Sequence, residues 1–146
     1  MEMILGSYPS WSLLIVRVVL GIIFFAHGAQ KVFGWFGGGG LKGTIGYFKQ
    51  SLGIPAGATV IAAFTECFGG LAVLVGFLAR PAALGLVIVM LVAIATVHWK
   101  NGFFLQSGQP GKGPGFEFNL ALIGMALAVL VGGAGRFSVD RLIRPW

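Results

Sequence analysis

The chain has 146 residues, of which 57% are hydrophobic and only 10% are charged. Soluble globular domains carry about 25% charged residues, so this composition, with a mean hydropathy of +0.93, excludes an ordinary soluble domain and indicates an integral membrane protein. The net charge of +6 comes from lysines and arginines that mostly flank apolar runs. That placement is typical of helix ends at a membrane surface and argues against a nucleic-acid partner.

Four apolar runs are long enough to cross the hydrocarbon core of a lipid bilayer as α-helices. They cover residues 11–33, 57–79, 81–99 and 116–133. Pro81 suits the first turn of the third helix, where its missing N–H costs no hydrogen bond. Backbone groups within lipid need internal hydrogen bonds. The predicted fold is therefore all-α, an integral membrane four-helix bundle made by one membrane domain over residues 1–146.

Two longer connections lie at one end of the predicted bundle. The first contains TIGYFKQSLGIP, in which Ile45, Phe48 and Leu52 share one face of a short interfacial helix between the first and second spans. The second, residues 100–115, is rich in glycine and proline and is expected to be a loop. Tryptophans at the predicted span ends and at the end of the chain indicate an interfacial aromatic belt: Trp11, Trp35, Trp99 and Trp146.

An even number of spans places both termini on one side of the membrane. The positive charges of the two sides nearly balance. The arginines on the side of the termini lie close to span ends, which favours cytoplasmic termini; they are Arg80, Arg136, Arg141 and Arg144. The single cysteine, Cys67, excludes a disulfide within the chain and is expected to be a small packing residue.

The segment GGGLKG at residues 38–43 fits the pattern G-x-G-x-x-G. The dinucleotide-binding fingerprint needs a preceding β-strand, whereas a membrane helix precedes this segment, so the match is spurious. We predict a tight interfacial turn instead, with aromatic neighbours in the headgroup region. This turn would close over His27, His98 and Glu117 as the lid of a pocket.

Ionisable residues at membrane depth are costly and mark either a function or a pairing. Arg17 lies ten residues before His27 in the first span, and Glu66 lies nine residues after Gly57 in the second. Antiparallel neighbours would bring them to one level, so we predict an Arg17–Glu66 ion pair. This pair is either a structural contact that fixes helix register or the floor of a ligand or proton-transfer site.

Further polar residues gather near the loop side, above the predicted pair, and they come from three of the four spans. They are His27, Lys31, His98, Lys100, Asn101, Glu117 and Asn119. Small residues follow Glu117 along one face of the fourth span, at Ala121, Gly124 and Ala128, and are expected to face the bundle. We interpret this end as a functional pocket.

A quinone headgroup suits such a pocket, because it needs hydrogen-bond donors for its carbonyls, an acid that relays protons, and apolar walls. The predicted proton relay is Glu66, His98 and Glu117. The predicted ligand-binding residues are Arg17, His27, Lys31, Trp35, Trp99, Asn101 and Asn119. A b-type haem held by His27 and His98 is the less favoured competitor, and no metal-ligand spacing is present.

Blocks of sequence that follow one another along nearly the whole chain resemble the DoxX family of small bacterial four-helix membrane proteins. The blocks are RVVLGIIFFAHGAQKVFGWFGG, GLKGTIGYF, LGIP, TECFGG, VMLVAIATVHWKNGFF, EFNLAL and GRFSVDRLI. The family-like positions are Arg17, His27, Gly28, Lys31, Gly34, Glu66, His98, Asn101, Gly102 and Glu117. The resemblance implies a multi-pass protein of a bacterial or archaeal plasma membrane, similar to the small membrane subunits of a thiosulfate:quinone oxidoreductase.

Three functions are compatible with these observations. The first is a quinone-interacting subunit of a membrane redox system, acting with other redox subunits or as a homo-oligomer. The second is a non-catalytic assembly or anchoring subunit of a larger membrane complex. The third is a small-molecule carrier. The chain has no soluble catalytic domain, so thiosulfate chemistry would need a partner, and whether the protein is itself an enzyme stays open.

Overall fold

The computed structural model describes residues 2–144, and every regular element in that range is helical. Three helical stretches are long and apolar enough to cross a membrane. They are α2 (Trp11–Val32), the continuous run of α4 (Ala56–Phe64), η2 (Thr65–Gly69) and α5 (Gly70–Val75), and the run of α6 (Ala79–Ala93), η3 (Ile94–His98) and η4 (Trp99–Asn101). A fourth apolar helix, α7 (Glu117–Gly132), is shorter at 16 residues. The predicted all-α class is confirmed.

The observed bounds differ from the predicted spans mainly at the second and third helices. The second ends at Val75, because Gly76 adopts a left-handed conformation with φ of 72° that closes the helix. The third begins at Ala79 and runs on to Asn101. Two segments, η2 and η3, have π-helical hydrogen bonding, which the apolar pattern of the sequence does not reveal.

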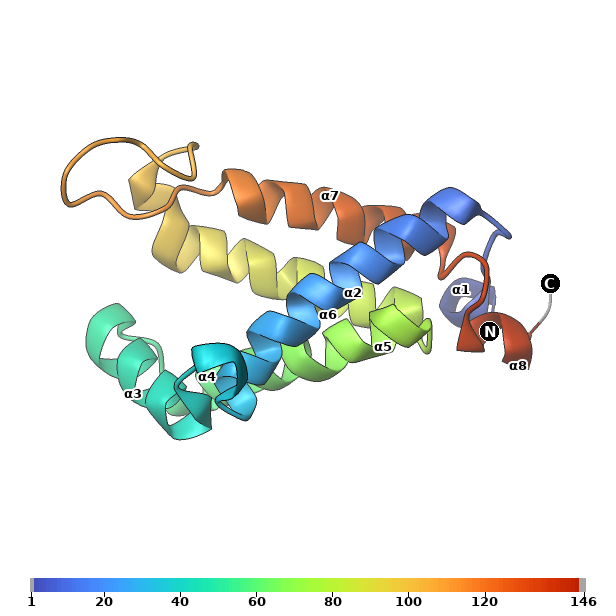
Figure 1. Cartoon of the computed structure of the whole chain (residues 1–146), viewed down its shortest axis with the longest axis horizontal. Helices are drawn as coiled ribbons and strands as arrows, with labels where there is room; N and C mark the ends of the chain where they lie inside the picture. The colour runs from blue at the N-terminus through green and yellow to red at the C-terminus, as the bar shows by residue number, and fades with distance from the viewer. Residues whose placement is uncertain (1, 145–146) are drawn as a thin grey trace.

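Shorter elements complete the chain at the two ends of the molecule (Figure 1). At one end, the turn η1 (Trp35–Gly37) leads into α3 (Gly40–Leu52), which packs on α2 and α4. The loop between η4 and α7 lies at the same end (Figure 1). At the other end lie α1 (Glu2–Leu5) and α8 (Val139–Ile143).

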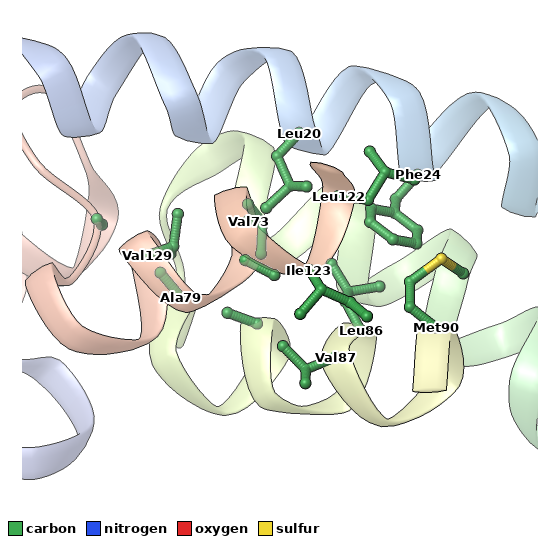
Figure 2. Packing of buried hydrophobic residues seen from close by; sticks show 13 residues of the cluster. Leu20, Phe24, Val73, Ala79, Leu86, Val87, Met90, Leu122, Ile123 and Val129 are labelled. Carbon is green, nitrogen blue, oxygen red and sulfur yellow. The ribbon is translucent and has the colours of Figure 1, made fainter. Parts of the chain in front are cut away.

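Buried aliphatic side chains from α2, α5, α6 and α7 form the core between the long helices (Figure 2). Leu20 of α2 and Val73 of α5 are fully buried, as are Leu86 of α6 and Val129 of α7. Many large apolar side chains instead point outward, including Ile15, Ile88 and Val131. An apolar exterior around an apolar core is what a lipid environment allows and water does not.

Glycines bring the backbone of α2 against the backbone of the α4–α5 run. A Cβ added to Gly28 would lie 2.2 Å from the Cys67 backbone, and one added to Gly70 would lie 2.5 Å from the Phe25 nitrogen. Ordinary van der Waals contact needs 3.4–4 Å. No larger residue fits at these positions without moving a helix. We call this contact the glycine seam; it also includes Gly21, whose added Cβ would meet Leu74.

Replacing Gly28 by alanine is expected to destabilise the protein by about 1–3 kcal/mol, the usual cost of overpacking a closed contact. Thermal unfolding in detergent should show a lower Tm for Gly28→Ala. Gly124→Ala is the matched control, because nothing lies within 4 Å of a Cβ added at Gly124. Equal Tm values for the two variants would contradict the glycine seam.

Candidate functional site: a cavity with polar groups on apolar walls

A cavity of about 380 Å³ lies beside α2, α4, α6 and α7 at the end of the molecule where α3 packs. Its lining is mostly apolar. The lining residues are Ile23, Phe24, His27, Lys31, Tyr47, Phe48, Leu52, Ile54, Ala58, Thr59, Ala62, Glu66, Val89, Met90, Val92, Ala93, Thr96, Val97, His98, Leu105, Pro114, Phe118, Asn119 and Leu122. Five of the predicted site residues therefore line one cavity: His27, Lys31, Glu66, His98 and Asn119.

The charged group of the cavity is an ion pair between Lys31 of α2 and Glu66 of η2. Lys31 Nζ donates a hydrogen bond to Glu66 Oε2. The Glu66 side chain is 6% exposed and that of Lys31 is 26% exposed. The pair thus places one carboxylate inside the cavity wall, with its countercharge at the more open side.

The predicted Arg17–Glu66 ion pair is wrong. The glycine seam places Gly28 beside Cys67 and Gly21 beside Leu74. In that register, Glu66 lies close to Lys31, about four turns of α2 from Arg17. The prediction assumed that the two helices are level at their loop ends. The observed register, continued along both helices, places Val32 beside Ala63. The first turns of α4 therefore extend past the end of α2.

Arg17 instead binds four backbone carbonyl oxygens at the end of the molecule opposite the cavity. Its guanidinium donates to the carbonyls of Val73 and Leu74 at the end of α5, and to those of Arg136 and Phe137. The last carbonyls of a helix lack intrahelical partners and carry the negative end of its dipole. Arg17 therefore caps α5 and does not contribute to the cavity.

Asp140 complements Arg17 on the same helical hairpin. Its carboxylate accepts hydrogen bonds from the backbone N–H groups of Leu78 and Ala79, at 2.7 and 2.9 Å. These are among the first N–H groups of α6, where a negative charge is stabilising. Asp140 is 1% exposed. The block GRFSVDRLI thus holds the hairpin between α5 and α6.

His98 lies in the π-helical segment η3 and is oriented by the loop that precedes α7. Its Nδ1 lies 2.9 Å from the carbonyl oxygen of Pro114. Asn101 Nδ2 donates to the same oxygen at 3.0 Å. Asn101 does not line the cavity, so the structure places it behind His98 rather than against a ligand.

The remaining predicted residues lie outside the cavity. Glu117 accepts a hydrogen bond from the Leu105 N–H at 2.9 Å and holds the loop against the start of α7. Trp99 stacks on Phe116 with ring centroids 5.4 Å apart. Trp35 packs on Phe33 with the rings tilted and their centroids 4.9 Å apart. None of the three predicted residues is part of the lining, so a direct role for them in ligand binding has no geometric support.

The helix α3 covers the cavity, and the glycine turn does not. Tyr47, Phe48 and Leu52 of α3 contribute to the lining. The glycine turn instead packs on α2, where Gln30 Nε2 donates to the Phe36 carbonyl at 3.2 Å. The expected glycine lid is therefore incorrect. Of the apolar face predicted for residues 44–55, Phe48 and Leu52 line the cavity and Ile45 does not.

The small-residue face of α7 also departs from expectation. Ala121, Gly124 and Ala128 are exposed, whereas Asn119 and Leu122 are buried. Asn119 donates from its amide nitrogen to the Met90 sulfur at 3.4 Å. Asn119 thus faces the cavity, and Ala121, Gly124 and Ala128 face outward.

Sequence reasoning missed two threonines in the lining, Thr59 and Thr96. Each hydroxyl donates to the carbonyl four residues earlier in its helix. Both lie in strongly apolar segments. The available signal for Thr59 was its position seven residues before Glu66, on the same helix face; Thr96, two residues before His98, carried no such signal. No group of three metal-binding side chains occurs within residues 2–144.

A helical chain with three apolar stretches of membrane-spanning length, and outward-facing apolar side chains, is a multi-pass membrane protein. Residues 12–99 match the sequence pattern of the DoxX family. The chain belongs to the DoxX family.

Three relatives cover most of the chain. “Putative oxidoreductase CatD” of Bacillus subtilis (strain 168) is 36% identical over 89% of this chain and 85% of its own length. The inner membrane protein YqjF of Escherichia coli (strain K12) is 28% identical over 91% and 93%. The uncharacterized membrane protein Rv3486 of Mycobacterium tuberculosis is 30% identical over 93% and 90%. No solved structure matches the chain.

Removing Lys31 alone is expected to destabilise the protein, because it leaves the buried Glu66 carboxylate without its partner. The cost for Lys31→Gln should be about 3 kcal/mol, the low end for buried pairs, since Lys31 is partly exposed. The double variant Lys31→Gln, Glu66→Gln should recover most of this loss. Denaturant unfolding in detergent micelles measures the free energy of unfolding of the wild-type protein, of Lys31→Gln and of the double variant.

Lys42→Gln is the control for that series, because Lys42 is exposed on α3 and lies outside the cavity lining. A Lys31→Gln variant as stable as Lys42→Gln would show that the ion pair contributes little.

Proposed function

We propose that α7 crosses the membrane with the three longer helices, so that the protein is a four-helix membrane bundle with α3 at the interface. The packing of α7 on α6 and α2 supports this arrangement, as does the wholly apolar stretch from Leu120 to Gly132. An α-helix of 16 residues spans about 24 Å, which a locally thinned bilayer or the flanking turns accommodate. Four crossings place both termini on the same side, which we propose is the cytoplasm.

Reporter fusions test this topology. A fluorescent protein that matures only in the cytoplasm should be bright at both the N-terminus and the C-terminus, and dark within the loop of residues 103–115. Alkaline phosphatase at the same positions should show the inverse pattern. Opposite signals at the two termini would show that one of the four helices does not cross.

We further propose that the cavity binds a quinone, or a ring of similar size and polarity, and that the protein serves a membrane redox system. The observation that supports this function is the composition of the cavity. A largely apolar space of about 380 Å³ presents a few polar groups from four helical stretches: His27, Lys31, Glu66, His98 and Asn119. Ligand sites have this combination of apolar walls and few convergent polar groups.

The position of the cavity suits an amphiphilic ring. Ile23, Phe24 and Leu122 lie on the side toward the core of the protein, while Lys31 and His98 lie near the ends of their helices. A polar head would meet the charged residues, and a hydrocarbon tail would meet aliphatic side chains. The name of the Bacillus subtilis relative, which includes the word oxidoreductase, is consistent with a redox role.

Extraction of ligands from the purified protein tests the quinone site. Solvent extraction and chromatography should recover quinone at close to one molecule per chain. Ala93→Phe fills the lining and should lower the recovery at least tenfold. Ala95→Phe is the matched control, because Ala95 is exposed in the same region and outside the lining. Equal recovery from both variants would contradict a quinone in this cavity.

The same preparation separates the alternatives. A haem held by His27 and His98 would give an intense visible absorption band in place of extracted quinone. An assembly subunit is the second candidate, favoured by the outward small residues Ala121, Gly124 and Ala128, which let a partner helix approach closely. A stable complex with another membrane protein and no bound small molecule, seen by native mass spectrometry, would support it over the quinone site.

A further inference from the structure

The two threonine hydroxyl groups of the cavity have already used their hydrogens on the protein. Thr59 Oγ1 donates to the Pro55 carbonyl at 3.1 Å, and Thr96 Oγ1 donates to the Val92 carbonyl at 2.7 Å. A hydroxyl has one hydrogen and two lone pairs. Toward a ligand, both threonines can therefore act only as acceptors.

In its neutral form, His98 is also an acceptor toward a ligand. The Pro114 carbonyl oxygen, 2.9 Å from His98 Nδ1, has no hydrogen to donate, so Nδ1 carries the hydrogen of the bond. A neutral imidazole has a single N–H. Its Nε2 then presents a lone pair, and the choice of tautomer is set by the group behind the ring.

The carboxylate and the amide complete the set of acceptors. Glu66 Oε2 accepts from Lys31, and Oε1 has no hydrogen-bond partner on the described part of the chain. Oε1 is not among the fully enclosed unpaired atoms, so it reaches the cavity that Glu66 lines. Asn119 uses one of its two amide hydrogens on the Met90 sulfur, which leaves its carbonyl oxygen as an acceptor and one amide hydrogen as a donor.

Donors toward the ligand are fewer. Lys31 has three ammonium hydrogens and uses one on Glu66. No hydrogen bond on the described part of the chain fixes the roles of the His27 ring nitrogens or the Tyr47 hydroxyl. The cavity groups whose hydrogen bonds are assigned therefore offer more acceptors than donors, because the donors are the Lys31 ammonium and one Asn119 amide hydrogen. A ligand with hydrogens of its own pairs with more of these groups than a ligand without them.

A quinone ring has carbonyl oxygens and no donor, so it would pair with Lys31 and leave Glu66 Oε1 and His98 Nε2 unpaired. A hydroquinone has two hydroxyls, each of which donates and accepts. We propose, on the basis of the quinone site argued above, that the cavity selects the hydroquinone form. One hydroxyl donates to His98 Nε2 and the other to Glu66 Oε1, while Lys31 donates to a ring oxygen.

Asn101 is the positioning residue for this selection. It donates to the Pro114 carbonyl at 3.0 Å and to the Val97 carbonyl at 3.4 Å. These bonds tie the loop before α7 to the end of η3 and hold Pro114 where His98 Nδ1 meets it. Asn101 acts through His98 and does not touch the ligand.

Binding of three matched probes to the delipidated protein tests the proposal under anaerobic conditions. The probes are menadione, its hydroquinone menadiol, and the dimethyl ether of menadiol, which keeps the ring and lacks both donors. Calorimetry should give a Kd for menadiol at least tenfold lower than those for menadione and the ether, since leaving a buried acceptor unpaired weakens binding.

Variants connect the preference to the named atoms. His98→Phe keeps a ring and removes the acceptor, so it should reduce the menadiol-to-menadione preference about tenfold. Asn101→Ala should reduce the preference about threefold or more without changing the affinity for menadione. Gln106→Ala is the control for Asn101, because it removes an exposed amide from the same loop and should preserve the preference.

The outcomes separate two claims, the selection of the hydroquinone form and the quinone site itself. Tight but equal binding of menadiol and menadione would overturn hydroquinone selection and leave the quinone site intact. Binding of the ether as tight as that of menadiol would also overturn the selection. Failure of all three probes to bind would overturn the quinone site itself. If His98→Phe does not fold, the comparison of menadiol with its ether on the wild-type protein still decides the selection.

Discussion

The close backbone contact between α2 and the α4–α5 run is the constraint on which the other features depend. Gly21, Gly28 and Gly70 leave no room for a Cβ at this glycine seam, so the two helices have one permitted register. Within lipid, apolar side chains gain little by leaving their surroundings, and helix association relies on close packing and polar contacts. Small residues at a helix contact therefore determine the position of every polar group along both helices.

The register distributes the charged side chains of α2 to opposite ends of the molecule. At one end, Arg17 meets the last carbonyls of α5, and Asp140 caps the neighbouring helix α6. At the other end, Lys31 meets Glu66. Both arrangements satisfy a buried charge with a complementary partner, as membrane depth requires. One is a structural clamp, and the other belongs to the wall of a cavity.

The sequence allowed the all-α class, the first span and five of the cavity residues to be predicted, because apolar length and polar residues within apolar runs are local signals. The predicted Arg17–Glu66 pair was wrong because the register of the two helices depends on which residues the glycines contact. No local sequence pattern reveals the partner of Gly28. The glycine lid and the inward face of α7 failed for a related reason. Gly124 and Gly28 look alike in sequence, and only packing shows that one is exposed and the other enclosed.

The same register also explains why a cavity forms where it does. The residues of α4 before Ala63 extend past the end of α2, so α3 packs on them in place of α2. Across the space, η3 carries His98 on a π-helical turn, and η2 carries Glu66 on another. Such turns re-aim side chains and are frequent at functional sites. Beyond the glycine seam, α3 covers the cavity, and Glu66 and His98 lie on helical turns that depart from the regular α-helix.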